Sequence, residues 1–156
     1  IIQMLESLGY QYDSSIHPTF ILGRYANLTA PTIPYHPSRY CVTKRGDSNV
    51  LEIPISVTPV LKLPISWWWL RNIGAWWSKI GYTRVLSQGN IGIFYAHPWE
   101  FVSCLEVKYV PFHMVRNTGW KMCNRFGDFV DYLHSKIRVK FVTLRDIADM
   151  YNITQG

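Results

Sequence analysis

The sequence predicts an α/β fold with parallel strands. Short apolar segments that are typical of strands alternate along the chain with segments of helical periodicity. The uninterrupted apolar run at residues 91–96 suits a central strand that is buried on both faces. The chain has 156 residues, of which 48% are hydrophobic and 17% charged, enough for one globular domain with a core. We therefore expect a single domain over residues 1–156.

The first third of the chain predicts a helix end, two short strands and a long loop. Residues 1–8 have apolar side chains at helical spacing and are followed by a glycine, which indicates the end of an amphipathic helix. Residues 10–16 predict a short strand. Residues 17–49 predict a loop with short extended pieces, because prolines recur there and remove backbone donors. Residues 51–57 predict an edge or bulged strand, since Pro54 lacks an N–H group.

The rest of the chain predicts three helices and two strands. Residues 67–79 have helical spacing, and residues 91–96 form the central strand already described. Residues 118–133 predict a helix with Cys123, Phe126, Val130 and Leu133 on its inner stripe. Residues 139–144 predict another strand and residues 145–151 a last short helix. Three or four strands are too few for a closed (β/α) barrel, which needs about eight.

A histidine stands directly after the central apolar run, in the segment Phe-Tyr-Ala-His-Pro-Trp-Glu at residues 94–100. Active sites of parallel α/β folds assemble at the carboxyl ends of strands. His97 can act there as an acid or a base near neutral pH, and Pro98 stiffens the exit from the strand. By its position alone, His97 fits a structural role as well as a catalytic one.

Four segments resemble, in the same order, motifs of the polysaccharide deacetylase family. Residues 94–100 are similar to the strand-end histidine motif of that family, in which Leu usually stands where this chain has Ala96. Residues 9–16, Gly-Tyr-Gln-Tyr-Asp-Ser-Ser-Ile, resemble its Gly-Tyr-x-Tyr-Asp-Ser-Ser-Ile segment. Residues 51–54 and 141–146 resemble its Leu-Glu-(Ile/Phe)-Pro strand and its C-terminal strand and helix start. The resemblance covers nearly the whole chain.

The resemblance implies the C-terminal portion of a distorted (β/α) barrel, incomplete as given. The family consists of metal-dependent hydrolases that remove N-acetyl or O-acetyl groups from a polysaccharide. A divalent metal, usually zinc, activates water, and a histidine protonates the leaving amine. By resemblance, His97 is this catalytic acid. Asp13 is either the carboxylate that sets this histidine or a turn-capping residue before two serines. Tyr95, Trp99 and Glu100 are expected to contact the substrate.

The family's metal ligands have no counterpart in this chain. Its Thr-Phe-Asp-Asp motif, its His-x-x-x-His-type motif and its Arg-x-Pro segment would all lie upstream of Ile1. We therefore expect no metal ligand here, and no activity of the chain alone on acetylated glycans. The alternative is a degenerate deacetylase-like module that binds a glycan or a partner without catalysis. Unpaired edges of a partial barrel also predict self-association as a homo-oligomer.

Composition limits the other classes of function. The net charge is +6, but no helix-turn-helix, RRM or zinc-finger signature is present, so no nucleic-acid partner is expected. The apolar stretch at residues 67–80 is interrupted by Arg71, Asn72 and Lys79 and is too short to span a membrane. Its five tryptophans fit a core or a sugar-stacking surface; one helical stripe cannot bury them all, so one or two should reach the surface. Three cysteines without a C-x-x-C pair leave the compartment open.

Overall fold

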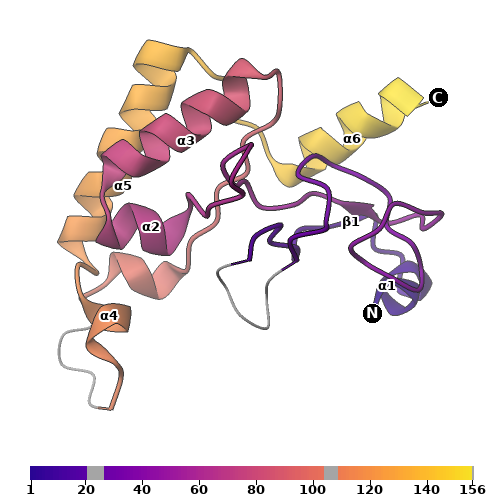
Figure 1. The fold of residues 1–156 in the computed structure, drawn as a ribbon, viewed down its shortest axis with the longest axis horizontal. Helices are drawn as coiled ribbons and strands as arrows, with labels where there is room; N and C mark the ends of the chain where they lie inside the picture. Colours follow the sequence, from indigo (N-terminus) through magenta and orange to yellow (C-terminus); the bar gives the residue numbers. More distant parts are fainter. Residues whose placement is uncertain (21–26, 104–108, 156) are drawn as a thin grey trace. The chain divides into compact units, whose positions relative to one another are not determined.

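The computed structural model describes residues 1–20, 27–103 and 109–155 of the chain. The chain forms two compact units, one made of Ile1–Leu63 and Lys140–Gly156 and the other of Pro64–Val139. We call them the strand unit and the helical unit after their secondary structure. In Figure 1 the helical unit runs from magenta to orange, and the strand unit is indigo and purple with a yellow C-terminal helix.

One pair of parallel strands organises the strand unit. β1 (Tyr12–Asp13) pairs with β2 (Leu51–Glu52), residue for residue in that order. Backbone hydrogen bonds continue the pairing, since the N–H of Ile53 donates to the carbonyl of Asp13 at 2.8 Å and the N–H of Ile55 extends the pattern at 3.0 Å. The two predicted strands are therefore confirmed in place and direction. They are shorter than predicted because the register shifts by one residue: Leu51 and Ile53 donate to Gln11 and Asp13, whereas Ile55 donates to Ile16.

Two helices complete the strand unit, α1 (Ile2–Ser7) and α6 (Leu144–Gln155). Gly9 takes a left-handed conformation with φ +78° just after α1, which confirms the predicted glycine stop. The amide and hydroxyl of Thr143 donate to Asp146 Oδ2 at 2.8 and 2.7 Å and fix the start of α6. Between the strands, the described residues 17–20 and 27–49 contain no helix, as predicted for the loop; residues 21–26 of that loop lie outside the described part.

The helical unit consists of helices in antiparallel and crossing arrangements (Figure 1). Their bounds are α2 (Trp67–Asn72), α3 (Ala75–Ser87), the 3-10 helix η2 (Pro98–Phe101), α4 (Phe112–Val115), α5 (Trp120–Tyr132) and a π-helical turn η3 (Leu133–Ile137). The single helix predicted for residues 67–79 is two helices. Gly74, at φ +127°, separates them in a conformation that other residues rarely adopt.

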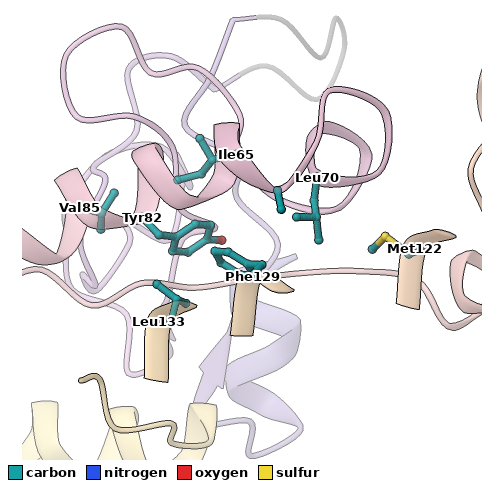
Figure 2. Close-up of a cluster of buried hydrophobic side chains, with 8 residues drawn as sticks. Ile65, Leu70, Tyr82, Val85, Met122, Phe129 and Leu133 are labelled. Atoms are coloured by element: carbon teal, nitrogen blue, oxygen red, sulfur yellow. The ribbon is translucent and has the colours of Figure 1, made fainter. Parts of the chain in front are cut away.

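Eight buried residues from the segment before α2, α2, α3, α5 and η3 form the core of the helical unit: Ile65, Leu70, Ala75, Tyr82, Val85, Met122, Phe129 and Leu133. Figure 2 shows them between the helices, with the Tyr82 ring beside that of Phe129, at 5.0 Å between centroids. Each large apolar side chain contributes about 1.5–3 kcal/mol when buried. Of the predicted inner stripe, Leu133 belongs to this core and Phe126 and Val130 pack against it, while Cys123 is only partly buried. Met122 and Phe129 of α5 join the core without having been predicted.

The prediction of a central strand at residues 91–96 is wrong. These residues are extended, but they pair with no strand in the described part of the chain. Two of their carbonyls are used by helices, since the hydroxyl of Tyr82 donates to Ile93 at 2.7 Å and the N–H of Trp67 donates to Tyr95 at 3.2 Å. The apolar content of residues 91–96 predicted burial between strands. Ile93 is buried against helices, and Ile91 is exposed.

The strand predicted for residues 139–144 is also wrong. Residues 139–143 have no strand partner among the described residues, and α6 begins at Leu144. Phe141 and Val142 are exposed, whereas side chains of a strand inside a sheet would be buried on at least one face. Across residues 1–20, 27–103 and 109–155 only β1 and β2 form a sheet, and no barrel is seen; a portion of a deacetylase-type barrel stays a prediction. In the same residues no helix has the length and apolar character that crossing a membrane requires.

Candidate functional site around His97

His97 lies between the extended residues 91–96 and the short helix η2. Its own backbone is extended, with φ −93° and ψ 141°. Pro98 is the first residue of η2, a position at which its missing N–H leaves no hydrogen bond unmade. His97 is partly buried and therefore keeps a surface toward solvent. The local sequence thus holds the histidine at a rigid corner of the chain.

Three aromatic side chains surround the imidazole of His97. The indole of Trp67 meets it edge to face, with 5.3 Å between ring centroids, and Trp99 stacks on it at 5.6 Å with 18° between the ring planes. The hydroxyl of Tyr95 forms a hydrogen bond with His97 Nε2 at 2.5 Å. Burial, and then the charge of Glu100, raise the pKa of Tyr95, so its hydroxyl stays protonated near neutral pH. The aromatic contacts leave the ring little freedom to turn.

Glu100 fixes the backbone beneath the imidazole. Its Oε1 accepts the backbone N–H of His97 at 3.2 Å, and its Oε2 accepts Arg71 Nε at 3.1 Å. Both side chains of this ion pair are 0% exposed. Burial raises the pKa of Glu100, while the N–H of His97 and the guanidinium of Arg71 oppose the rise. Removal of one partner from such a buried pair costs about 3–5 kcal/mol, because the other charge is left uncompensated.

Arg71 connects several segments of the helical unit. Its Nη1 donates to the carbonyl of Arg116 at 2.6 Å, at the end of α4. Its guanidinium also lies over the ring of Trp99, 5.4 Å from the centroid. The carbonyl of Arg71 accepts hydrogen bonds from the side chains of Asn117 and Arg125. One residue of α2 therefore contacts η2, the end of α4, and α5.

Asp13 belongs to the strand unit and His97 to the helical unit, so their expected pairing stays a prediction. Within the strand unit Asp13 lies opposite Glu52 in the strand register, and its Oδ1 accepts the hydroxyl of Ser15 at 2.9 Å. This Asp-Ser contact is the one that a turn-capping role predicts. Glu52 is 1% exposed, and its Oε1 accepts the N–H of Ile16 at 2.9 Å. Burial, with a smaller contribution from Asp13, raises the pKa of Glu52 to about 7.

The described residues do not supply a site for the metal that the resemblance implies. Across residues 1–20, 27–103 and 109–155 no group of three or more His, Cys, Asp or Glu side chains is placed to hold an ion. The described histidines other than His97 are dispersed. His17 is partly buried in the strand unit, His36 packs its ring against Tyr151, His113 lies on α4, and His134 is exposed in η3. The chemistry of this site is thus that of its imidazole, its tyrosine hydroxyl and its indoles.

The tryptophans of α2 and α3 serve mainly as packing residues. Trp69 and Trp77 are partly buried and lie 6.4 Å apart between ring centroids, and Trp77 Nε1 donates to Pro64 at 3.0 Å. Trp76 is 56% exposed, which confirms that one tryptophan of this block reaches the surface. Trp67 alone in the block contacts His97 among the ring pairs of the described residues. It is therefore the member of the block that can contribute to a ligand site.

Comparison with known protein families assigns the chain to one of them. Residues 14–147 match the model of a family described as Domain of unknown function (DUF3473). The match covers most of the chain, so the chain belongs to this family. No curated protein and no solved structure matches it.

Two residues of the site, Arg71 and Trp67, were not singled out from the sequence. Arg71 was noted only as a charge that interrupts an apolar stretch, although a charge in such a stretch needs a buried partner and so signals an ion pair. Trp67 was one of five tryptophans in the block at residues 67–77, and the sequence did not indicate which of them lies at the site. Glu100 was expected to contact substrate, and the structure gives it contacts with Arg71 and His97. Substrate contacts of Glu100, Tyr95 and Trp99 stay predictions.

Proposed function

We propose that the chain is the C-terminal section of a metal-dependent polysaccharide deacetylase and that His97 is its proton donor. The observation that carries this proposal is the setting of His97. Its imidazole is partly exposed, flanked by Trp67 and Trp99, and held from below by a buried ion pair. A structural histidine needs no such set of supports. The motif resemblance at residues 94–100 and 9–16 supplies the reaction class.

In the proposed reaction His97 acts on the leaving group. The acetyl carbon is attacked by water, and the bond from that carbon to the sugar nitrogen breaks. The nitrogen takes a proton from the imidazolium of His97, which becomes neutral, while the former water oxygen leaves in acetate. Tyr95 is the hydrogen-bond partner of Nε2 in the structure, so the substrate amine would displace its hydroxyl. The attacking water gives up its proton to a base, which would be supplied by residues other than those described here.

Sugar rings stack on indole faces through their apolar C–H surfaces. Trp99 and Trp67 are partly buried, each contacts the imidazole, and each keeps some exposed surface. A sugar held on these indoles would bring its acetamido group beside His97. This arrangement supports Trp99 and Tyr95 as substrate contacts and adds Trp67 to them.

The second candidate function is a glycan-binding module without catalysis. One observation favours it: the hydroxyl of Tyr95 occupies Nε2 at 2.5 Å. The same indoles would then hold the sugar, and His97 would be a hydrogen-bonding residue. The two candidates differ in whether acetate is released.

The test is made on the full polypeptide encoded by the reading frame that contains residues 1–156. Acetate release from acetylated chitooligosaccharides is measured with added zinc, and His97→Gln is compared with the unchanged protein. We expect the variant to lose about 10²–10⁴-fold in turnover, the usual contribution of a general acid. Equal turnover of the two proteins would exclude His97 as the acid. Sugar binding without acetate release by either protein would favour the module.

A further inference from the structure

The buried ion pair of Arg71 and Glu100 has a direct connection to the candidate acid. Glu100 Oε2 receives Arg71 Nε at 3.1 Å, and Glu100 Oε1 receives the N–H of His97 at 3.2 Å. The two oxygens of one carboxylate thus join a guanidinium from α2 to the backbone of His97. Both side chains are 0% exposed. A charged acceptor in a dry site holds its donor more firmly than a neutral one.

Arg71 is itself held from several directions. Its Nη1 donates to the carbonyl of Arg116 at 2.6 Å, and its guanidinium faces the ring of Trp99 at 5.4 Å. Trp99 in turn stacks on His97. The guanidinium therefore reaches the imidazole by two routes, through the carboxylate to its backbone and through the indole to its ring face.

We propose that Arg71 and Glu100 are positioning residues, which set the direction of the His97 imidazole without contacting substrate. The proposal deepens the proposed function and rests on it for its purpose. The effect of the ion pair on the position of His97 can be measured on this chain without substrate. If the pair is lost, the backbone of residues 97–100 is free to open, and the ring loses its register with Trp99 and with the hydroxyl of Tyr95.

The alternative is that the pair only stabilises the helical unit, and the two roles can be separated. Replacement of both partners of a buried ion pair by apolar residues is often neutral for stability or even stabilising. The double variant Arg71→Met with Glu100→Leu should therefore stay folded. It removes both connections to His97 that the pair provides.

Lys79 and Asp128 give a matched control. They form a second ion pair among the described residues of the helical unit, joining α3 to α5 at 2.6 Å. Lys79→Met with Asp128→Leu removes the same two charges at a distance from the imidazole, since Lys79 contacts Asp128 and the ring of Tyr132. The control variant and the test variant are compared as folded chains of equal net charge.

Two measurements on the chain without substrate report the position of His97. The first is hydrogen exchange of the His97 amide. The second is the ¹⁵N spectrum of its imidazole, which distinguishes the two neutral tautomers and the contact of Nε2 with Tyr95; comparison with His97→Gln identifies its signals among the five histidines. In the double variant we expect about tenfold to a hundredfold faster exchange and a changed imidazole spectrum. The control variant should keep the exchange rate of the His97 amide within about twofold of the unchanged protein and should leave the imidazole spectrum unchanged.

A folded double variant with unchanged amide exchange and an unchanged imidazole spectrum would overturn the proposal. Should the double variant not fold, Glu100→Gln takes its place, since the amide keeps the shape of the side chain but loses the charge that binds Arg71; an unchanged imidazole spectrum there would overturn the proposal equally. These readouts need no turnover. Failure of the proposed function would show separately, as equal acetate release by His97→Gln and the unchanged protein.

Discussion

Glu52 makes the stability of the strand unit depend on pH. Folding raises the pKa of this carboxyl from its ordinary value of 4.5 to about 7, because the side chain is buried and faces Asp13 across the strand pair. Between these two values the folded chain binds a proton that the unfolded chain has released. The stabilisation is therefore complete below pH 4.5 and is lost as the pH rises to about 7. Each pKa unit corresponds to about 1.4 kcal/mol, so the loss amounts to about 3 kcal/mol.

Glu52→Gln is the perturbation that tests this reasoning. The amide oxygen can still accept the N–H of Ile16, and the side chain cannot ionise. The variant should match the unchanged protein at pH 5 and exceed it by up to about 3 kcal/mol at pH 8. Glu6→Gln is the control with the opposite sign. Arg39 donates to Glu6 and lowers its pKa, so the contribution of Glu6 is lost on acidification and not on alkalinisation.

The assay must observe the strand unit itself. All 7 tryptophans of the chain lie between residues 67 and 120, in the helical unit, so their fluorescence does not report on Glu52. Hydrogen exchange of the amides of Leu51 and Ile53, which donate to Gln11 and Asp13, does report on it. After correction for intrinsic rates, their opening should become about a hundredfold more frequent in the unchanged protein between pH 5 and pH 8. The same pH dependence in Glu52→Gln would refute the reasoning.

The remaining predictions concern the core of the helical unit, with urea unfolding followed by tryptophan fluorescence. A Cβ on Gly81 would lie 2.5 Å from Ile65 Cγ2, so Gly81→Ala should destabilise by about 1–3 kcal/mol; Gly127→Ala, with open space around its Cβ, should instead stabilise by up to about 1 kcal/mol. Phe129→Ala should cost about 3–5 kcal/mol, because Phe129 is 1% exposed. Trp120→Ala, at 76% exposure, should change stability by less than about 0.5 kcal/mol. Equal effects within either pair would contradict the packing described.

Local signals in the sequence located much of the secondary structure. The glycine after residues 1–8 and the helix after Thr143 are set by interactions between neighbouring residues, and these predictions were confirmed. The predicted strands at 91–96 and 139–144 failed for a different reason. A strand exists only where another strand supplies its hydrogen bonds, and apolar content does not reveal whether one is present.

The residues of the candidate site show the same difference between contacts that are local in the sequence and contacts that are not. His97 could be predicted as a site residue because its motif is contiguous in the sequence, and the same motif contains Tyr95 and Trp99. Arg71 is 29 residues from Glu100 along the chain, and only the folded arrangement of α2 and η2 brings them together. A charge within an apolar stretch can reveal that a partner exists, but not which residue it is.

The position of Arg71 has a consequence for protein engineering. The carboxylate under His97, the end of α4, and the side chains of Asn117 and Arg125 all contact this one residue. A histidine loop taken from residues 91–101 and transplanted onto another scaffold would arrive with an unpaired acid at its base. Any such transfer must carry the helix that bears the arginine, or replace the acid by an apolar side chain and fix the loop by other means.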